Sequence, residues 1–218
     1  MKPEIKWLSK GEPKILTHHG NEYKSGISKD SVEEIDVTFQ RIIGDDVENH
    51  QYHGGPDRVV CVYPFEHYPF WEQKFGTELP HAAFGENLTV TGMKESQVCI
   101  GDIFRIGDTL LQVAQGRFPC VTINMHTHQD ELLKEIFRTG YTGYFFRVLE
   151  EGKISINSTI ELVKKHPLEV TVAMIHSTYF DDPRNLEKIE LILSVEELAL
   201  DWRGKLEKLK VKALNSNR

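Results

Sequence analysis

The alternation of hydrophobic and polar positions predicts short strands over the first three quarters of the chain. Residues 16–27 (LTHHGNEYKSGI) are typical of strand–turn–strand, and residues 31–39 (SVEEIDVTF) alternate in part, as a half-buried strand does. Residues 58–64 (RVVCVYP) form a continuous apolar run, which indicates a strand buried on both faces. Residues 86–92 (ENLTVTG) alternate again, and we expect another strand there.

Glycine positions predict where these elements end. Residues 65–76 (FEHYPFWEQKFG) indicate a short helix that Gly76 ends. Residues 101–116 indicate a hairpin that turns at Gly107-Asp108. Two further strands are expected in residues 142–154 and 158–165.

One helix is predicted inside this strand-rich part. In residues 127–140 (THQDELLKEIFRTG), Thr127 and Asp130 fit a capping box, and Gly140 fits the C-terminal cap. Four apolar residues form a stripe between them: Leu132, Leu133, Ile136 and Phe137.

The pattern changes from strands to helices at His166-Pro167. Residues 171–180, 185–193 and 194–214 each show helical spacing, with Ser194 as the expected cap of the last helix. We therefore expect a β-rich, mixed α+β protein: a barrel-like domain over residues 1–165 and a small three-helix unit over residues 166–218. The apolar face of the last helix holds Leu198, Trp202, Leu206 and Leu209. A unit of this size buries little core alone, so we expect it to pack on the barrel or on a partner.

Composition and charge narrow the function classes. The 218 residues carry a formal net charge of -7, which disfavours a general nucleic-acid binder. No secretory signal and no membrane span is expected from the apolar runs. Three separated cysteines without a CxxC motif disfavour both a disulfide framework and structural zinc. The expectation is a reduced, soluble, cytoplasmic protein.

Five loop or strand-end segments combine polar residues with glycine, proline or aromatic residues, the position where β scaffolds present ligand groups. They are residues 23–29, 49–60, 83–90, 116–120 and 143–149. The candidate residues are Ser25 and Lys29 in the first segment, His53, Asp57 and Arg58 in the second, Glu86 and Asn87 in the third, Arg117 and Cys120 in the fourth, and Arg147 in the fifth. Structural interpretations stand beside these: the HGG stretch also fits a plain turn, and Glu86-Asn87 also fits a turn cap.

Cys120, in VAQGRFPCVTIN, has two interpretations from the residues alone. A lone cysteine after a strand is usually a small buried hydrophobe, the interpretation we give Cys61 and Cys99. Pro119 fixes the backbone before Cys120, Arg117 is close by, and a helix is expected just after it. Those features favour the thiolate, which binds soft metals or attacks electrophiles.

Other cofactor motifs are missing. The sequence has no GxGxxG, no GxxxxGK[ST] and no GxSxG. His126 and His128, with His50 and His53, suggest metal binding, but no carboxylate stands at a characteristic ligand spacing, so no protein-built metal site is expected. A redox enzyme of this kind would need electrons from another protein.

Several motifs in fixed order resemble the MOSC domain, named for the C-terminal domain of molybdenum cofactor sulfurase. They are SGISK, HGGPDRVVCVYPFEHYPFW, FGENLTVTG, VCIGDIFRIGD, QVAQGRFPC and GYFFRVLEEG. The segment from HPLEVTVA resembles the three-helix unit of the stand-alone bacterial branch, which includes proteins that detoxify N-hydroxylated purine bases. Bacterial members tend to have an aromatic or basic residue after the cysteine, followed by a lysine. The sequence after Cys120, VTINMHTH, departs from this pattern.

The resemblance implies a molybdenum cofactor site with Cys120 as the metal ligand and catalytic residue. It implies Lys29, His53, Arg58, Arg117 and Arg147 as residues for the anionic cofactor. Ser25, Asp57, Glu86 and Asn87 are then expected to line the pocket or contact substrate. The sulfurase's pyridoxal phosphate domain is absent, so no pyridoxal phosphate site is expected.

The expected function is reduction of small N-hydroxylated compounds, with electrons from a separate flavin or iron–sulfur reductase. The alternative is a non-enzymatic carrier of cofactor or sulfur that uses a Cys120 persulfide. A third interpretation is a binding module that has lost the cofactor. The sequence leaves a homodimer open.

Overall fold

The computed structural model describes residues 2–216, which form twelve strands, seven α-helices and one short 3-10 helix. The strands are β1 (Glu4–Lys10), β2 (Lys14–His18), β3 (Asn21–Ser25), β4 (Asp30–Ser31), β5 (Glu34–Val37), β6 (Val60–Pro64), β7 (Leu88–Thr91), β8 (Ile103–Ile106), β9 (Thr109–Gly116), β10 (Tyr144–Glu150), β11 (Gly152–Ser155) and β12 (Ile160–Lys164). The helices are α1 (His50–His53), η1 (Pro56–Arg58), α2 (His67–Phe75), α3 (Thr122–Thr127), α4 (Leu132–Thr139), α5 (Val172–Phe180), α6 (Leu186–Leu193) and α7 (Leu200–Ser216). The expected mixed α+β class is confirmed.

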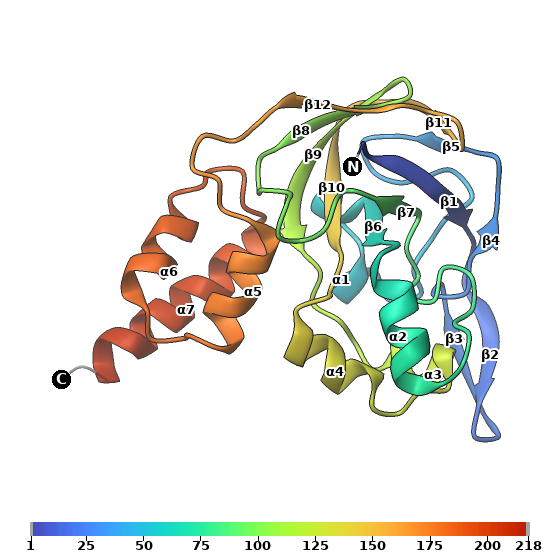
Figure 1. Ribbon diagram of the computed structural model, residues 1–218, viewed down its shortest axis with the longest axis horizontal. Helices are drawn as coiled ribbons and strands as arrows, with labels where there is room; N and C mark the ends of the chain where they lie inside the picture. Colours follow the sequence, from blue (N-terminus) through green and yellow to red (C-terminus); the bar gives the residue numbers. More distant parts are fainter. Residues whose placement is uncertain (1, 217–218) are drawn as a thin grey trace.

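The centre of the fold is an eight-stranded sheet that curls into a half-barrel (Figure 1). Its strand order is β12-β8-β9-β10-β6-β7-β1-β4, and only the β6–β7 pair is parallel among the neighbours of this sheet. Two smaller ladders, β11–β5 and β2–β3, complete the strands of residues 2–216. The β2–β3 hairpin extends away from the sheet beside α3 (Figure 1).

Burial follows the sequence pattern in most strands. All five residues of β6 are buried, as the apolar run predicts, because β6 lies between β10 and β7. In β5, Ile35 and Val37 are buried whereas Glu34 and Asp36 are exposed, so this strand is half-buried as expected. The strand expected in ENLTVTG is present as β7, and it is buried at all four positions, since it lies between β6 and β1.

The predicted turns are confirmed where glycine adopts a positive φ. Gly76 ends α2 with φ +66°, and Gly107 turns the β8–β9 hairpin with φ +56°. Gly140 ends α4 with φ +73°. These left-handed conformations cost glycine little because it has no Cβ.

Two predicted caps are wrong. Thr127 is the last residue of α3 rather than a cap of α4, and its hydroxyl donates to the Ile123 carbonyl. Ser194 ends α6, where its hydroxyl donates to the Leu191 carbonyl, and α7 begins later, at Leu200. In both places the loop between helices is longer than the capping pattern assumes.

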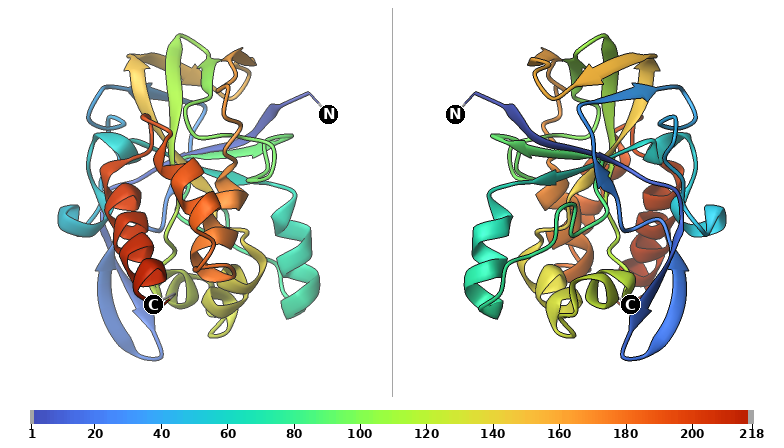
Figure 2. Two further views of the ribbon diagram at one scale, coloured as in Figure 1. Left: turned by 90° about the vertical axis from the view of Figure 1, so that its left-hand side faces the viewer. Right: turned by 90° about the vertical axis from the view of Figure 1, so that its right-hand side faces the viewer.

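The three C-terminal helices stand side by side next to the sheet, as the views from the two sides show (Figure 2). Their buried residues Ile192, Trp202 and Leu206 belong to the same hydrophobic core as the sheet residues Val113 and Phe146. Two hydrogen bonds fix α7 and the residue directly before it to β9. The Trp202 indole N–H donates to the Gly116 carbonyl at 2.7 Å, and the Ala199 N–H donates to the Ala114 carbonyl at 3.0 Å. The helices therefore pack on the barrel, as expected.

Within residues 2–216, no helix has both the length and the apolar character that crossing a bilayer requires.

The shared core predicts a large difference between two leucines of α7. Leu206→Ala removes a fully buried side chain and should lower the free energy of unfolding by about 2–5 kcal/mol. Leu200→Ala, on the same helix, removes a side chain that is 80% exposed and should change it by less than about 0.5 kcal/mol. Urea unfolding followed by far-UV circular dichroism measures both, and equal effects would contradict the shared core.

Candidate functional site

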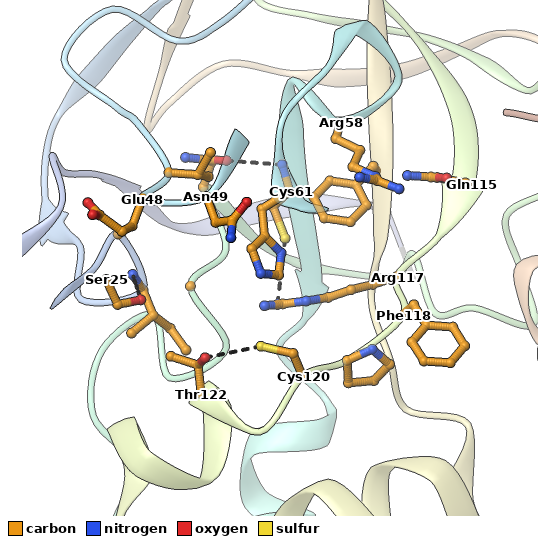
Figure 3. A pocket seen from close by; sticks show the side chains of 18 of the residues that line it. Ser25, Glu48, Asn49, Arg58, Cys61, Gln115, Arg117, Phe118, Cys120 and Thr122 are labelled. Atoms are coloured by element: carbon orange, nitrogen blue, oxygen red, sulfur yellow. Dashed lines mark hydrogen bonds between the residues drawn. The ribbon is translucent and has the colours of Figure 1, made fainter. Parts of the chain in front are cut away.

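A cavity of about 720 Å³ lies where the strand ends meet the C-terminal helices. Its lining comes from β3, α1, η1, β6, β9, α3, β10 and α7, from the loops before α1 and β7, and from the loops after β3 and β9. The α7 residues Asp201, Trp202 and Lys205 form part of this lining, so the C-terminal helices help to build the cavity. Figure 3 shows the lining from close by.

Cys120 lies in the loop after β9, two residues before α3, and is partly exposed to the cavity. Its Sγ lies 3.2 Å from the hydroxyl oxygen of Thr122 (Figure 3). Burial raises the pKa of Cys120, but hydrogen bonds with His53 and Thr122 and the charge of Arg117 outweigh burial and lower the pKa from 9.0 to about 6. The thiolate is therefore the main form at neutral pH.

Arg117 links Cys120 with a second cysteine of the cavity. Its guanidinium donates to the Phe84 carbonyl and to the Cys61 Sγ, the latter at 3.7 Å. In the view of Figure 3 the end of the Arg117 side chain lies between the two sulfur atoms. Burial raises the pKa of Cys61 to about 11, so the cavity holds one thiolate and one neutral thiol.

Most cationic side chains of the cavity have a carboxylate partner. The pairs are Lys24–Glu48 at 2.9 Å, Lys29–Asp45, Arg58–Asp201 at 2.9 Å and Lys205–Asp201 at 2.5 Å. Asp201 is shared by two cations, and Arg117 has no carboxylate within ion-pair distance among residues 2–216. Excess positive charge therefore remains at Arg117 and at the α7 rim, which favours an anionic ligand.

Glu86 lies behind the cavity wall rather than in it. Its carboxylate is fully buried and accepts hydrogen bonds from the Tyr68 hydroxyl at 2.6 Å, the Thr89 hydroxyl at 2.8 Å and the Phe84 N–H at 3.1 Å. These donors compensate the loss of water around a buried carboxylate. Glu86 thus holds α2 to the start of β7 and contacts no cavity surface.

Asn87 lines the cavity and also joins three segments. Its side-chain oxygen accepts from the Cys61 N–H at 3.0 Å, and its amide donates to the Ser9 carbonyl at 3.2 Å and to Asp45 at 3.1 Å. Because Asp45 also pairs with Lys29, the amide fixes the cation at the cavity floor. Glu86 and Asn87 therefore do more than cap a turn, because their side chains join segments that are far apart in the sequence.

Arg147 and Asp57 pair with each other away from the cavity lining. The Arg147 Nε donates to Asp57 at 2.8 Å, and its other nitrogens donate to the Gln112 side chain and the Glu197 carbonyl. Through these three hydrogen bonds, the Arg147 guanidinium fixes η1 and the loop before α7 to the sheet. Arg147, Asp57 and Glu86 are not among the residues that line the cavity, and the cofactor and pocket roles expected for them stay predictions.

The other predicted residues converge on the one cavity: Ser25, Lys29, His53, Arg58, Asn87, Arg117 and Cys120. Sequence reasoning missed Cys61 as a cavity residue and the α7 pair Asp201 and Lys205. Cys61 sits in an apolar strand and carries no local signal of a site. The α7 residues have the spacing of an ordinary exposed helical ion pair, i and i+4, so only the packing of α7 reveals them.

Comparison with known proteins places these features in a family. The model of the MOSC domain matches residues 49–161, just over half of the chain, and that of the YiiM-like, 3-alpha helix domain matches residues 170–210. The chain is 40% identical to the Bacillus subtilis (strain 168) protein YflK over 208 residues, which cover 95% of this chain and 94% of YflK. It is also 40% identical over 117 residues, or 52% of its length, to 21% of a protein of Gibberella moniliformis (strain M3125 / FGSC 7600) named Reductase.

A solved structure agrees with the sequence matches. YiiM from Geobacillus stearothermophilus superposes with a TM-score of 0.81 at 32% identity, over 95% of this chain and 99% of that one. The chain belongs to the MOSC domain family, and its C-terminal helices form the YiiM-like three-helix domain.

The environment of Cys120 predicts the pH dependence of its alkylation. Only the thiolate reacts, so the rate with iodoacetamide should be constant above about pH 7 and fall about tenfold per pH unit below the pKa of about 6. His53→Ala removes a hydrogen bond that lowers this pKa, so the midpoint should rise toward 9.0. Mass spectrometry identifies the modified cysteine and gives the rate at each pH.

His50→Ala is the matched control, because His50 lies on the same short helix but pairs with Asp46. It should leave the midpoint unchanged. A midpoint of 8 or above in the unaltered protein would contradict a Cys120 thiolate at neutral pH. The same midpoint after His53→Ala would contradict the role given to His53.

Proposed function

We propose that this MOSC-family chain binds the molybdenum cofactor in the cavity and reduces N-hydroxylated compounds, among them N-hydroxylated purine bases. The observation that carries the proposal is the Cys120 thiolate, stabilised beside Arg117 at the wall of a cavity with excess cationic charge. The MOSC family is associated with this cofactor. Binding of the molybdenum cofactor and the N-hydroxylated substrate are both proposals.

The residues present fit such a group. A soft thiolate such as Cys120 suits molybdenum. Arg117 and the Arg58–Asp201–Lys205 cluster offer charge-assisted hydrogen bonds to the pterin phosphate. A volume of about 720 Å³ is in the range of sites for small organic ligands. When bound, the cofactor would supply the two-electron redox centre.

The proposed reaction is balanced in electrons and protons. The N–O bond of the substrate breaks, two electrons and two protons are taken up, and an amine and water leave. The electrons come from a separate flavin or iron–sulfur reductase. A similar stretch within a longer protein named Reductase supports such a partner. The imidazole of His53, hydrogen-bonded to Cys120, can hold or deliver a proton at the site.

A sulfur carrier is the second candidate, supported by the same low pKa of Cys120. A thiolate at neutral pH can attack the outer sulfur of a donor persulfide, whose inner sulfur leaves as a thiolate, and would hold the transferred sulfur as a persulfide. The neutral thiol of Cys61 makes it a poor carrier beside Cys120. A mass increment of one sulfur on Cys120, with no reductase activity in the presence of a competent electron donor, would replace the first proposal by this one.

Cofactor content and activity test the proposal together. The protein, made in a host that produces the molybdenum cofactor, should copurify with molybdenum and pterin and reduce an N-hydroxylated purine when given a flavin or iron–sulfur electron donor. Cys120→Ser removes the soft ligand at nearly constant volume and should lower bound molybdenum about tenfold or more. Metal analysis, pterin fluorescence and product chromatography provide the measurements.

Two arginine variants separate charge from folding. Arg117→Gln should lower pterin content, because it removes a cavity cation that has no carboxylate partner among the described residues. Arg105→Gln is the control, since Arg105 pairs with Glu150 on the exposed β8 face away from the cavity. Absence of both molybdenum and pterin from the unaltered protein, with Cys120→Ser behaving identically, would refute the proposal.

A further inference from the structure

A cluster of histidines lies outside the cavity, where the tip of the β2–β3 hairpin meets the loop between α3 and α4. His18 is the last residue of β2, His19 begins the turn, and Asp130 comes from the α3–α4 loop. Their candidate ligand atoms all lie within 4.8 Å of one another. The sequence pattern drew attention to His126 and His128, but the structure brings this different set together.

The spacing within the cluster fits a metal ion better than hydrogen bonds. The Asp130 Oδ1 lies 3.8 Å from the His18 Nε2 and 3.9 Å from the His19 Nε2. Both distances are too long for a hydrogen bond. Ligand atoms around tetrahedral zinc are roughly 3.3 Å apart when each bond is about 2.0–2.1 Å. The two histidine–carboxylate distances would therefore shorten by about half an ångström, and the two histidine ligand atoms, which lie within 4.8 Å of each other, would also draw together.

The hairpin turn is what makes the two histidines converge. Neighbouring residues of a strand point to opposite faces, so adjacent histidines normally diverge. Here His19 has φ +48° and Gly20 has φ +78°, and the turn brings the two ring centroids to 4.1 Å. The His18 side chain is only 14% exposed, and the His128 ring stacks on it at 5.5 Å.

The His18 Nε2 is the ring nitrogen turned toward the cluster. The His18 Nδ1 is buried with no hydrogen-bond partner among the described residues, whereas the Nε2 faces Asp130. Asp130 is also held in place by a residue of α3. The amide of the buried Asn124 donates to the Asp130 carbonyl and accepts from the Leu133 N–H at 2.7 Å.

We propose that His18, His19 and Asp130 form a Zn²⁺ site, with both histidines binding through Nε2. Two imidazoles and one carboxylate are a ligand set that zinc uses in proteins, with water completing the coordination. The ion would join the hairpin that carries Lys24 and Ser25 of the cavity to the segment that follows Cys120. Zinc would thereby stiffen one wall of the cavity.

Isothermal titration with ZnCl2 tests the site in full-length protein without a polyhistidine tag, after dialysis against a chelator. Every sample carries Cys120→Ser, so that the cavity thiolate contributes no zinc binding and the outcome is independent of the proposed redox function. About one equivalent of Zn²⁺ should bind. Adding His19→Ala should weaken this binding about tenfold or more, since even groups that only orient a ligand contribute 10- to 100-fold.

His50→Ala is the matched control, because His50 is exposed and pairs with Asp46 outside the cluster. It should leave zinc affinity unchanged. Asp130→Asn should weaken binding as His19→Ala does, and both exposed positions tolerate these changes in folding. Binding weaker than about 1 mM, or equal affinity with and without His19, would overturn the proposal.

Discussion

The buried pair Glu86-Asn87 is the constraint on which the arrangement of the sheet centre depends. Polar groups removed from water must be hydrogen-bonded, or each one costs about 1–3 kcal/mol. Glu86 meets this demand with donors from α2 and β7, and Asn87 meets it with backbone groups of β1 and β6. The parallel β6–β7 register and the position of β1 are thereby tied to two consecutive residues.

The same constraint shapes the candidate site. Asn87 fixes the Cys61 backbone and, through Asp45, the Lys29 ammonium, so the cavity floor is rigid and its charge is balanced. Arg117 differs, because its guanidinium contacts a carbonyl and a sulfur instead of a carboxylate. Its charge lowers the pKa of both thiols, so the opposite shifts have another cause: burial dominates at Cys61, whereas the hydrogen bonds of His53 and Thr122 outweigh burial at Cys120.

The C-terminal helices are part of the site as well as part of the core. The hydrogen bond from Trp202 to the Gly116 carbonyl seats α7 directly beside the loop that carries Cys120. Asp201 and Lys205 then reach the cavity rim, where Asp201 holds Arg58. A change in the packing of α7 would consequently alter the electrostatics around the thiol, although α7 lies about 80 residues later in the chain.

The sequence by itself determined most elements and the fold class. Apolar runs, glycine turns and the GRFPC loop act over a few neighbouring residues, so β6, the β8–β9 hairpin and the environment of Cys120 could be predicted. Only the tertiary structure determined which groups the polar side chains contact. Arg147 pairs with Asp57, the buried Glu86 accepts a hydrogen bond from Tyr68, and Asp201 of α7 lines the cavity and pairs with Arg58. The physical reason is that the position of a charged group depends on burial and on distant partners, and no local pattern encodes a partner 90 or 143 residues away.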